Sequence, residues 1–244
     1  MKLQLPSQVF IELMFCVVFV ITCNAQIKIH NQSDLTKRQQ EIIQVLLLDN
    51  YPHEQNLKKF KRSEVVKALK VAQRFTSGAD SANYAYLLAY MRENYAGNKA
   101  RLIEIANSCV KYKPKDINYE CTENAAWFLH KLYLRGDNSI VQPLFHWAKG
   151  SDAALSEGLG TAYAEIVSKD PILFLQTLKA FKLQDQIHII DFAIRQDGSC
   201  NPSCLPLKTR KFLIAISKNL RHPLQKFAAL FVSVMNDPNQ KYSK

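Results

Sequence analysis

Two cysteines stand four positions apart in the segment "DGSCNPSC", residues 197–204. Cys200 and Cys204 flank Asn-Pro-Ser, a turn sequence, so the pair could hold a metal, exchange electrons or close a loop. A zinc knuckle usually has two residues between its cysteines, and the candidate histidines, His188 and His222, lie on segments that read as helices. A redox pair needs Cys-x-x-Cys at a helix start in a βαβ setting, which is missing here. The first expectation is a disulfide, with a zinc site or free thiols as alternatives.

The start of the chain predicts the compartment in which these cysteines would sit. Lys2 is followed by an apolar run over residues 13–21 and by Cys23-Asn24-Ala25, a layout typical of a secretory signal cleaved after Ala25. The run is shorter than the about 20 apolar residues that cross a bilayer. We therefore expect residues 1–25 to be removed and the protein to be secreted or periplasmic. A lipid anchor on Cys23 is the alternative, because residues 20–23 loosely resemble a lipoprotein box, although Thr22 departs from it.

Removal of that leader would leave four cysteines, an even number in an oxidising compartment, which favours two disulfides. Four cysteines allow three pairings. We expect the sequential one because each bridge would then close a short loop rich in turn residues. The residues of the two predicted bridges are Cys109 with Cys121 and Cys200 with Cys204.

Motifs that would identify a common enzyme class are missing from the sequence. It has no nucleophile elbow, phosphate loop, zinc-protease helix or glycine-rich dinucleotide turn, and we expect neither a metal nor a cofactor. Glycosidases need two carboxyl groups about 5 to 9 Å apart across a cleft. The candidate acids for such a pair are Glu120, Glu123, Glu157 and Glu165. Their ordinary interpretation is as solvated acids near helix starts, where they favour the helix dipole.

Histidine and tryptophan lie close together at two places. His130 follows Trp127 by three residues on one predicted helix, and His146 precedes Trp147 on another. Such a cluster could bind a ligand, but side chains of this kind more often fill a core. We therefore expect packing to account for both.

Basic residues outnumber acidic ones, with 32 Lys and Arg against 21 Asp and Glu and a net charge of +11. A strongly basic surface attracts acidic partners. The densest run, "KKFKR" at 58–62, supplies the predicted binding residues Lys58, Lys59, Lys61 and Arg62, and weaker runs lie at 111–115 and 208–211. Cations at helix C-termini are commonly only solvated. Outside the cytoplasm we expect an acidic protein or an anionic envelope polymer ahead of nucleic acid.

The helix "SANYAYLLAYMRENY" is the most tyrosine-rich part of the chain, with Tyr86 and Tyr90 one turn apart. Tyrosine is enriched at recognition surfaces, so both residues are candidates for an exposed binding patch. A helix in a stacked array has two faces to cover, and core packing would account for most of the stripe.

Apolar residues recur at helical spacing along the chain, and only 7 glycines interrupt them. Val65, Leu69 and Ala72 share one face, for example, with Ser63 as the expected N-cap. Prolines 143, 171 and 223 each precede such a pattern, where a first helical position favours proline. No alternating stretch indicates a strand, so we predict an all-α fold. The expected helices are 36–49, 64–76, 81–95, 98–111, 119–135, 143–149, 152–168, 171–182, 184–196, 208–219 and 223–235.

From residue 64 onward the helices group into pairs of about 30 to 40 residues, the length of helical solenoid repeats. Over residues 64–236 this weakly resembles the HEAT and armadillo-like repeat proteins. The resemblance implies antiparallel helix pairs stacked as an α-solenoid, and an irregular bundle is the alternative. We expect a single domain over 36–236, with a flexible segment at 26–35 and a loose tail at 237–244.

Together these features predict an exported, non-catalytic helical protein that binds an acidic macromolecule. An inhibitor, an immunity protein or an envelope adaptor would fit equally well. An all-α hydrolase of an acidic wall polymer, using two of the acids above, is the alternative. Attachment to anionic lipid through the basic runs is a third hypothesis.

Overall fold

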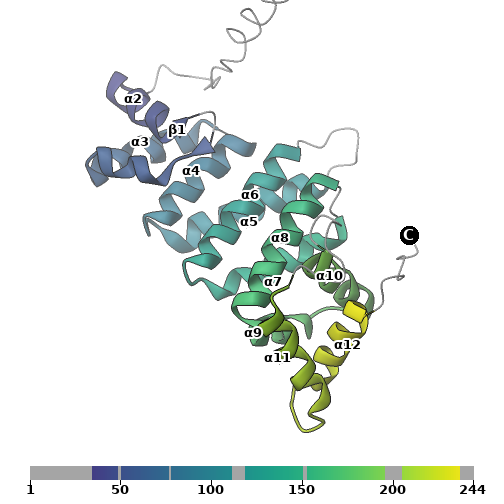
Figure 1. Ribbon diagram of the computed structural model, residues 1–244. Coiled ribbons are helices and arrows are strands. Elements are labelled where there is room, and N and C mark those ends of the chain that lie inside the picture. Colours follow the sequence, from purple (N-terminus) through teal and green to yellow (C-terminus); the bar gives the residue numbers. More distant parts are fainter. Residues whose placement is uncertain are drawn as a thin grey trace, which may run out of the picture. The chain divides into compact units, whose positions relative to one another are not determined.

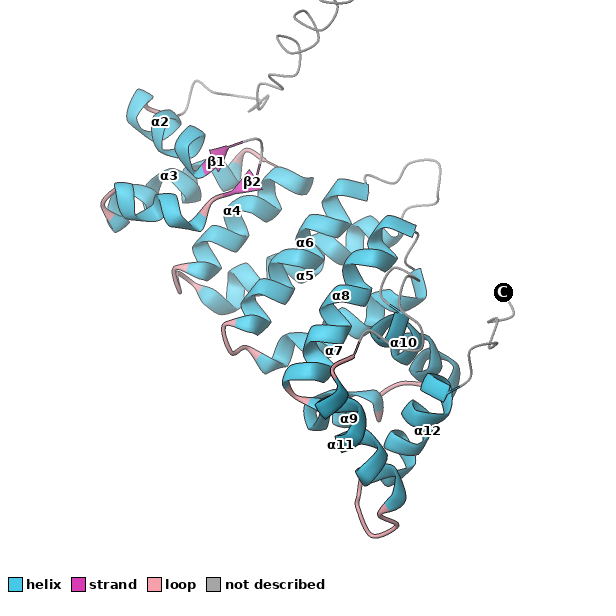
Figure 2. Cartoon of the chain, viewed as in Figure 1, coloured by secondary structure: helices cyan, strands magenta, loops and turns pink. Residues whose placement is uncertain are grey.

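The computed structural model describes residues 35–48, 51–76, 78–111, 119–150, 153–195 and 205–236. The described chain is all-α apart from one very short strand pair (Figure 2). It divides into two compact units at Thr76 and Ser77, where the sequence predicted one domain over 36–236. The predicted leader, the tail at 237–244 and all but residue 35 of the flexible segment predicted at 26–35 lie outside the described residues.

The first unit pairs two helices around a small apolar core. Its elements are α2 (Lys37–Leu46), β1 (Leu47–Leu48), β2 (Tyr51–Pro52), the 3₁₀ helix η2 (Glu54–Lys59) and α3 (Arg62–Arg74). Thr36 caps α2 by accepting a bond from the Gln39 amide, while the Gln39 side chain accepts one from the Thr36 amide. Strands β1 and β2 form a two-residue antiparallel hairpin. The sequence did not predict this hairpin, because two residues are too few to show alternation.

The start of α3 differs from the prediction. We expected Ser63 as the N-cap, but the helix begins at Arg62 and Lys61 is the cap. The Glu64 carboxylate accepts a bond from the Lys61 amide at 3.4 Å and lies 3.5 Å from Arg38 on α2. Glu64 therefore caps α3 and also links it to α2, an interaction that a local sequence pattern does not contain.

The second unit contains the remaining helices. They are α4 (Gly78–Tyr90), α5 (Tyr95–Lys111), α6 (Tyr119–Leu134), η3 (Asn138–Ile140), α7 (Val141–His146), η4 (Trp147–Gly150), α8 (Ala153–Lys169), α9 (Pro171–Leu178), α10 (Leu183–Arg195), α11 (Leu207–Lys218) and α12 (Gln225–Asn236). The α-helices match the predicted segments to within five residues at each end, which confirms the helical interpretation of their apolar patterns.

The prolines fulfil their predicted role in one case of three. Pro171 is the first residue of α9, and the Asp170 carboxylate accepts a bond from the Leu173 amide at 2.9 Å. Pro143 instead lies inside α7, because a 3₁₀ turn starts the helical segment earlier. Pro223 lies in the turn before α12.

The helices of the second unit stack as antiparallel pairs in a two-layer array, as predicted (Figure 1). In one layer, α4 packs on α6, α6 on α8, α8 on α10 and α10 on α12. In the other layer, α5 packs on α4 and α6, α9 packs on α8, and α11 packs on α12. Aromatic rings fill the interior. Phe174, for example, lies 4.9 Å from Phe145 and 5.7 Å from Phe231 between ring centroids.

Candidate functional site

The four basic residues predicted to bind lie in the first unit and are exposed. Lys58 and Lys59 end η2, and Lys61 and Arg62 start α3. Phe60, which stands among them in sequence, is half-buried, and the Arg38 guanidinium lies 5.2 Å above its ring. The short connection between η2 and α3 therefore groups these cations on one corner of the unit.

Helix electrostatics accounts for only part of this cluster. Lys58 and Lys59 stand at the C-terminal end of a helical turn, where a cation is favourable. Lys61 and Arg62 stand at the N-terminus of α3, where the dipole disfavours positive charge. The nearby Glu64 offsets some of that repulsion, but it also pairs with Arg38. Lys61 and Arg62 are exposed, as the interpretation of basic runs as solvated charges expects, but the helix dipole does not favour their position.

The two tyrosines proposed for a binding patch lie in the second unit. Tyr86 is only 1% exposed and its ring stacks on Phe128 at 4.5 Å. Its ring is thus occupied in the core, as the packing interpretation expects. Tyr90 is half-buried, and the Arg135 guanidinium lies 3.6 Å from its ring centroid. Tyr86 and Tyr90 belong to the second unit, whereas the basic cluster belongs to the first.

Arg135 makes a second contact with the same residue. Its Nη1 donates a 2.7 Å bond to the Tyr90 carbonyl, the last carbonyl of α4. Arg135, just after α6, therefore covers the ring of Tyr90 and donates a hydrogen bond to the last carbonyl of α4.

The next pair of helices in the layer repeats this arrangement. Lys169, the last residue of α8, lies 5.0 Å above the ring of Tyr133 on α6. Its Nζ donates a 3.1 Å bond to the carbonyl of Leu134, the last residue of α6. Successive helices of the layer are thus joined by the same two contacts. The sequence contains tyrosine and cation at both places, but their spacing differs enough to hide the repeat.

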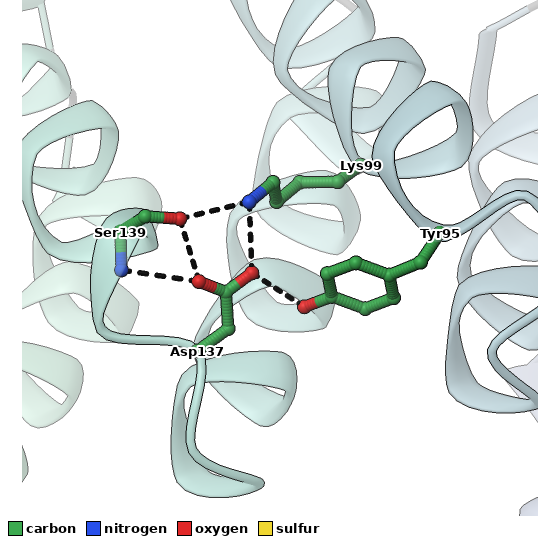
Figure 3. Close-up of polar contacts among 4 residues, drawn as sticks. All are labelled: Tyr95, Lys99, Asp137 and Ser139. Carbon is green, nitrogen blue, oxygen red and sulfur yellow. Dashed lines mark hydrogen bonds and ion pairs between the residues drawn. The ribbon is translucent and has the colours of Figure 1, made fainter.

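A polar network joins α5 to the turn after α6 (Figure 3). One oxygen of Asp137 accepts bonds from the Tyr95 hydroxyl at 2.6 Å and from Lys99 Nζ at 2.9 Å. Its other oxygen accepts bonds from the Ser139 amide at 3.1 Å and from the Ser139 hydroxyl at 2.6 Å. Lys99 also donates to the Ser139 hydroxyl at 2.8 Å. The segment Gly136-Asp137-Asn138-Ser139 has the local signature of a capped turn, but the partners on α5 are about 40 residues away.

The network holds its charges in fixed states. Burial alone would raise the pKa of Asp137, but the hydrogen bonds from Ser139, Tyr95 and Lys99, with the charge of Lys99, outweigh burial and lower this pKa to about 2. Burial and the bond to Asp137 raise the pKa of the Tyr95 hydroxyl. Near neutral pH the carboxylate is therefore ionised and the phenol protonated. This arrangement suits a structural clamp better than proton transfer.

The predicted histidine cluster on α6 is buried. His130 is fully buried, with its ring 5.4 Å from Trp127, and its Nε2 lies 3.0 Å from a Glu165 oxygen on α8. The carboxylate is out of hydrogen-bond alignment, so among the described residues neither ring nitrogen has a hydrogen-bond partner. Burial and the charge of Lys169 lower the pKa of His130 to about 4. This histidine is neutral and packed, as expected of a core residue.

Several predicted sites lie at positions whose side chains the structure does not describe. They are the acids Glu120, Glu123 and Glu157, the basic run 111–115, and the cysteines Cys109, Cys121, Cys200 and Cys204. The hydrolase and disulfide hypotheses therefore stay hypotheses. The basic run 208–211 forms the first turns of α11.

Among the described residues, no group of three or more His, Cys, Asp or Glu is placed to hold a metal ion. Within the same ranges, no helix has the length and apolar character needed to cross a membrane. Comparison with known proteins found no matching family model, no matching curated protein and no matching solved structure.

Proposed function

We propose that this chain is an exported, non-catalytic helical protein whose first unit binds an acidic macromolecule, either a protein or an anionic envelope polymer. The binding residues are Lys58, Lys59, Lys61 and Arg62. Tyr86 is left out of the proposed surface because its ring is covered by Phe128. The resemblance to HEAT and armadillo-like repeats is part of the proposal, supported by the repeated cation–tyrosine contacts of the stacked layer.

The observation that carries the proposal is the position of Lys61 and Arg62 at the N-terminus of α3. Exposed cations there oppose the helix dipole, so the dipole does not favour their position. An acidic partner would add negative charge beside these exposed cations. Each cation near such a partner would also speed association through long-range attraction, which salt screens.

Export and the disulfides belong to the same proposal. Cys109 lies two residues before the end of α5 and Cys121 two residues after the start of α6. These helices are consecutive and pack on each other. This packing supports a bridge between Cys109 and Cys121, with Cys200 and Cys204 as the second bridge.

The test is capture of partners from an envelope fraction with immobilised protein, followed by elution with salt. The variant Lys58→Gln/Lys59→Gln/Lys61→Gln removes three charges from the proposed surface. Its control, Lys67→Gln/Lys179→Gln/Lys182→Gln, removes three exposed charges elsewhere. We expect the wild type and the control to retain a macromolecule that the first variant loses. Retention of the same partner by both variants, or of none by the wild type, would refute the proposal.

A further inference from the structure

The C-terminal hairpin, formed by α11, α12 and their connection over residues 205–236, has an unusual charge balance. It contains six Lys and Arg residues and no Asp or Glu: Lys208, Arg210, Lys211, Lys218, Arg221 and Lys226. Of the two helices, α12 packs on α9, α10 and α11, whereas α11 packs chiefly on α12 (Figure 1). One side of α11 is therefore left open to solvent.

That open side mixes cations with large apolar side chains. Thr209, Leu213 and Ile216 are buried toward α12, and the opposite arc of α11 is exposed. It carries Leu207, Lys208, Lys211, Phe212, Ala215 and Lys218. Leu207 is 58% exposed and Phe212 is 40% exposed.

The loop between α11 and α12 also exposes an apolar side chain beside a cation. Leu220 is 85% exposed at the turn, next to the exposed Arg221. In Figure 1 this loop projects beyond the neighbouring helices of the unit. Leu220 is therefore a third large apolar side chain that the hairpin exposes, with Leu207 and Phe212.

The cations of the hairpin differ from those of the helices α4 to α8, although Lys179 and Lys182, which lie between α8 and the hairpin, are exposed and likewise make no side-chain contact of these kinds with the described residues. Between residues 78 and 170, all six Lys and Arg with described side chains have an acid or an aromatic ring as partner: Arg92, Lys99, Arg101, Lys131, Arg135 and Lys169. In the hairpin, none of the six side chains makes a hydrogen bond, ion pair or ring contact with the described residues. The Nε atom of Arg210 is even buried without a partner.

Neighbouring elements supply little compensating charge. On α10, which packs on α12, the described acids are Asp185 and Asp191, and both are half-buried. On the side of α9, Asp170 is engaged in capping the helix. Among the described residues, the positive charge of the hairpin is therefore largely uncompensated and would attract an anionic partner.

We propose that the α11–α12 hairpin is a docking surface for an anionic lipid bilayer. Clusters of four to eight Lys and Arg on a helical surface are typical of binding to acidic head groups. A fluid bilayer accepts separate apolar side chains between cations without demanding a complementary shape, which suits Leu207, Phe212 and Leu220. The lysine stems lie along the interface while their ammonium groups reach the phosphates. This site is independent of the proposed function of the first unit.

The experiment is co-sedimentation of the full chain with vesicles of phosphatidylcholine, with or without phosphatidylglycerol, at low and high NaCl. We expect binding only to the anionic vesicles, and a loss of binding at high salt because salt screens the lipid charge. Binding to neutral vesicles of equal strength would overturn the electrostatic part of the proposal.

Two variants locate the surface. Lys208→Gln/Lys211→Gln/Lys218→Gln should weaken binding about a hundredfold, at about fivefold for each cation removed. Leu220→Ser keeps the charge and should weaken binding several-fold by removing an inserted side chain. Because Leu220 and the three lysines are exposed, these changes leave the core intact, and circular dichroism checks the fold.

The matched control is Lys58→Gln/Lys59→Gln/Lys61→Gln, with the same charge change on the first unit. It should bind anionic vesicles within about fivefold of wild type. Equal losses in the two triple variants, an unaffected Leu220→Ser, or no vesicle binding by the wild type would each overturn the proposal. If the wild type binds no vesicles but still captures an acidic partner, the lipid proposal fails and the proposed function of the first unit is unaffected.

Discussion

Arg135 is joined to Tyr90 twice: its guanidinium lies 3.6 Å from the Tyr90 ring centroid, and its Nη1 donates to the Tyr90 carbonyl at 2.7 Å. The two residues are 45 positions apart in sequence. The contact closes the C-terminal end of α4 with a side chain from the next helix of the same layer. Lys169 does the same for α6. A hydrogen bond from one helix to the free carbonyl at the end of its neighbour links the two helices directly.

Loss of this contact should destabilise the second unit. Arg135→Met keeps the aliphatic stem but removes the ring contact and the bond to the carbonyl, which together contribute about 1.5 kcal/mol. Urea unfolding measures the change. Arg101→Met is the control, since its exposed pair with Glu104 contributes at most about 0.5 kcal/mol. Equal costs for the two variants would contradict the stated role of Arg135.

The clamp around Asp137 predicts a mutational effect. Asp137→Asn removes the charge that faces Lys99 and weakens the acceptor of four bonds, so the free energy of unfolding should fall by about 2 kcal/mol. Asp185→Asn, at a half-buried carboxylate in the first turn of α10 that forms no ion pair with the described residues, should cost less than about 0.5 kcal/mol. Thermal unfolding followed by circular dichroism distinguishes them.

The same clamp predicts loss of stability in acid. Because the pKa of Asp137 is about 2 in the folded chain and its usual value is 3.8, the unfolded chain takes up the proton more readily. The stabilisation is therefore complete above pH 4 and is lost as the pH falls from about 4 to about 2. In Asp137→Asn, the acid part of the stability curve should be flatter than in wild type over this window.

His130 predicts a second loss of stability, at less acidic pH than the loss predicted from Asp137. Its pKa is lowered from 6.5 to about 4 by burial, so the unfolded chain binds the proton more tightly. Stability should be full above pH 6.5 and should decline by about 2 to 3 kcal/mol as the pH falls to 4. His130→Phe should remove this slope. His188→Phe, at a half-buried histidine on α10, serves as the comparison. If the pH dependence of stability persists in His130→Phe, groups other than His130 cause it.

Two glycines should respond to alanine in opposite directions. Gly136 follows α6 with a φ of +102°, a conformation that a side chain disfavours, so Gly136→Ala should cost about 1 to 2 kcal/mol despite open space around it. Gly158 lies inside α8, also with open space, and Gly158→Ala should stabilise the chain by about 0.5 to 1 kcal/mol. Urea unfolding of both variants tests the signs. A gain at Gly136 would show that the turn relaxes freely.

Apolar periodicity was sufficient to predict the helices from α2 to α12, because each helix buries one face and the spacing of that face is written locally. Asp170-Pro171 was sufficient for the start of α9 for the same reason, since a cap and the residue it caps are neighbours. The hairpin of β1 and β2 and the start of α3 were missed. The two strands are too short to show alternation, and α3 is capped at a lysine, a residue type that does not mark a helix start.

The sequence by itself determined that this chain is all-α, strongly basic and built of paired helices, because composition and spacing of 3.6 residues are properties of short segments. Only the tertiary structure decided which charges have partners. Arg135 and Lys169 lie on tyrosines and helix ends of the preceding helix in the layer, whereas Lys208, Lys211 and Lys218 of α11 are exposed. Pairing of this kind depends on the order in which helices stack, and residues more than 30 positions apart carry no local sign of it.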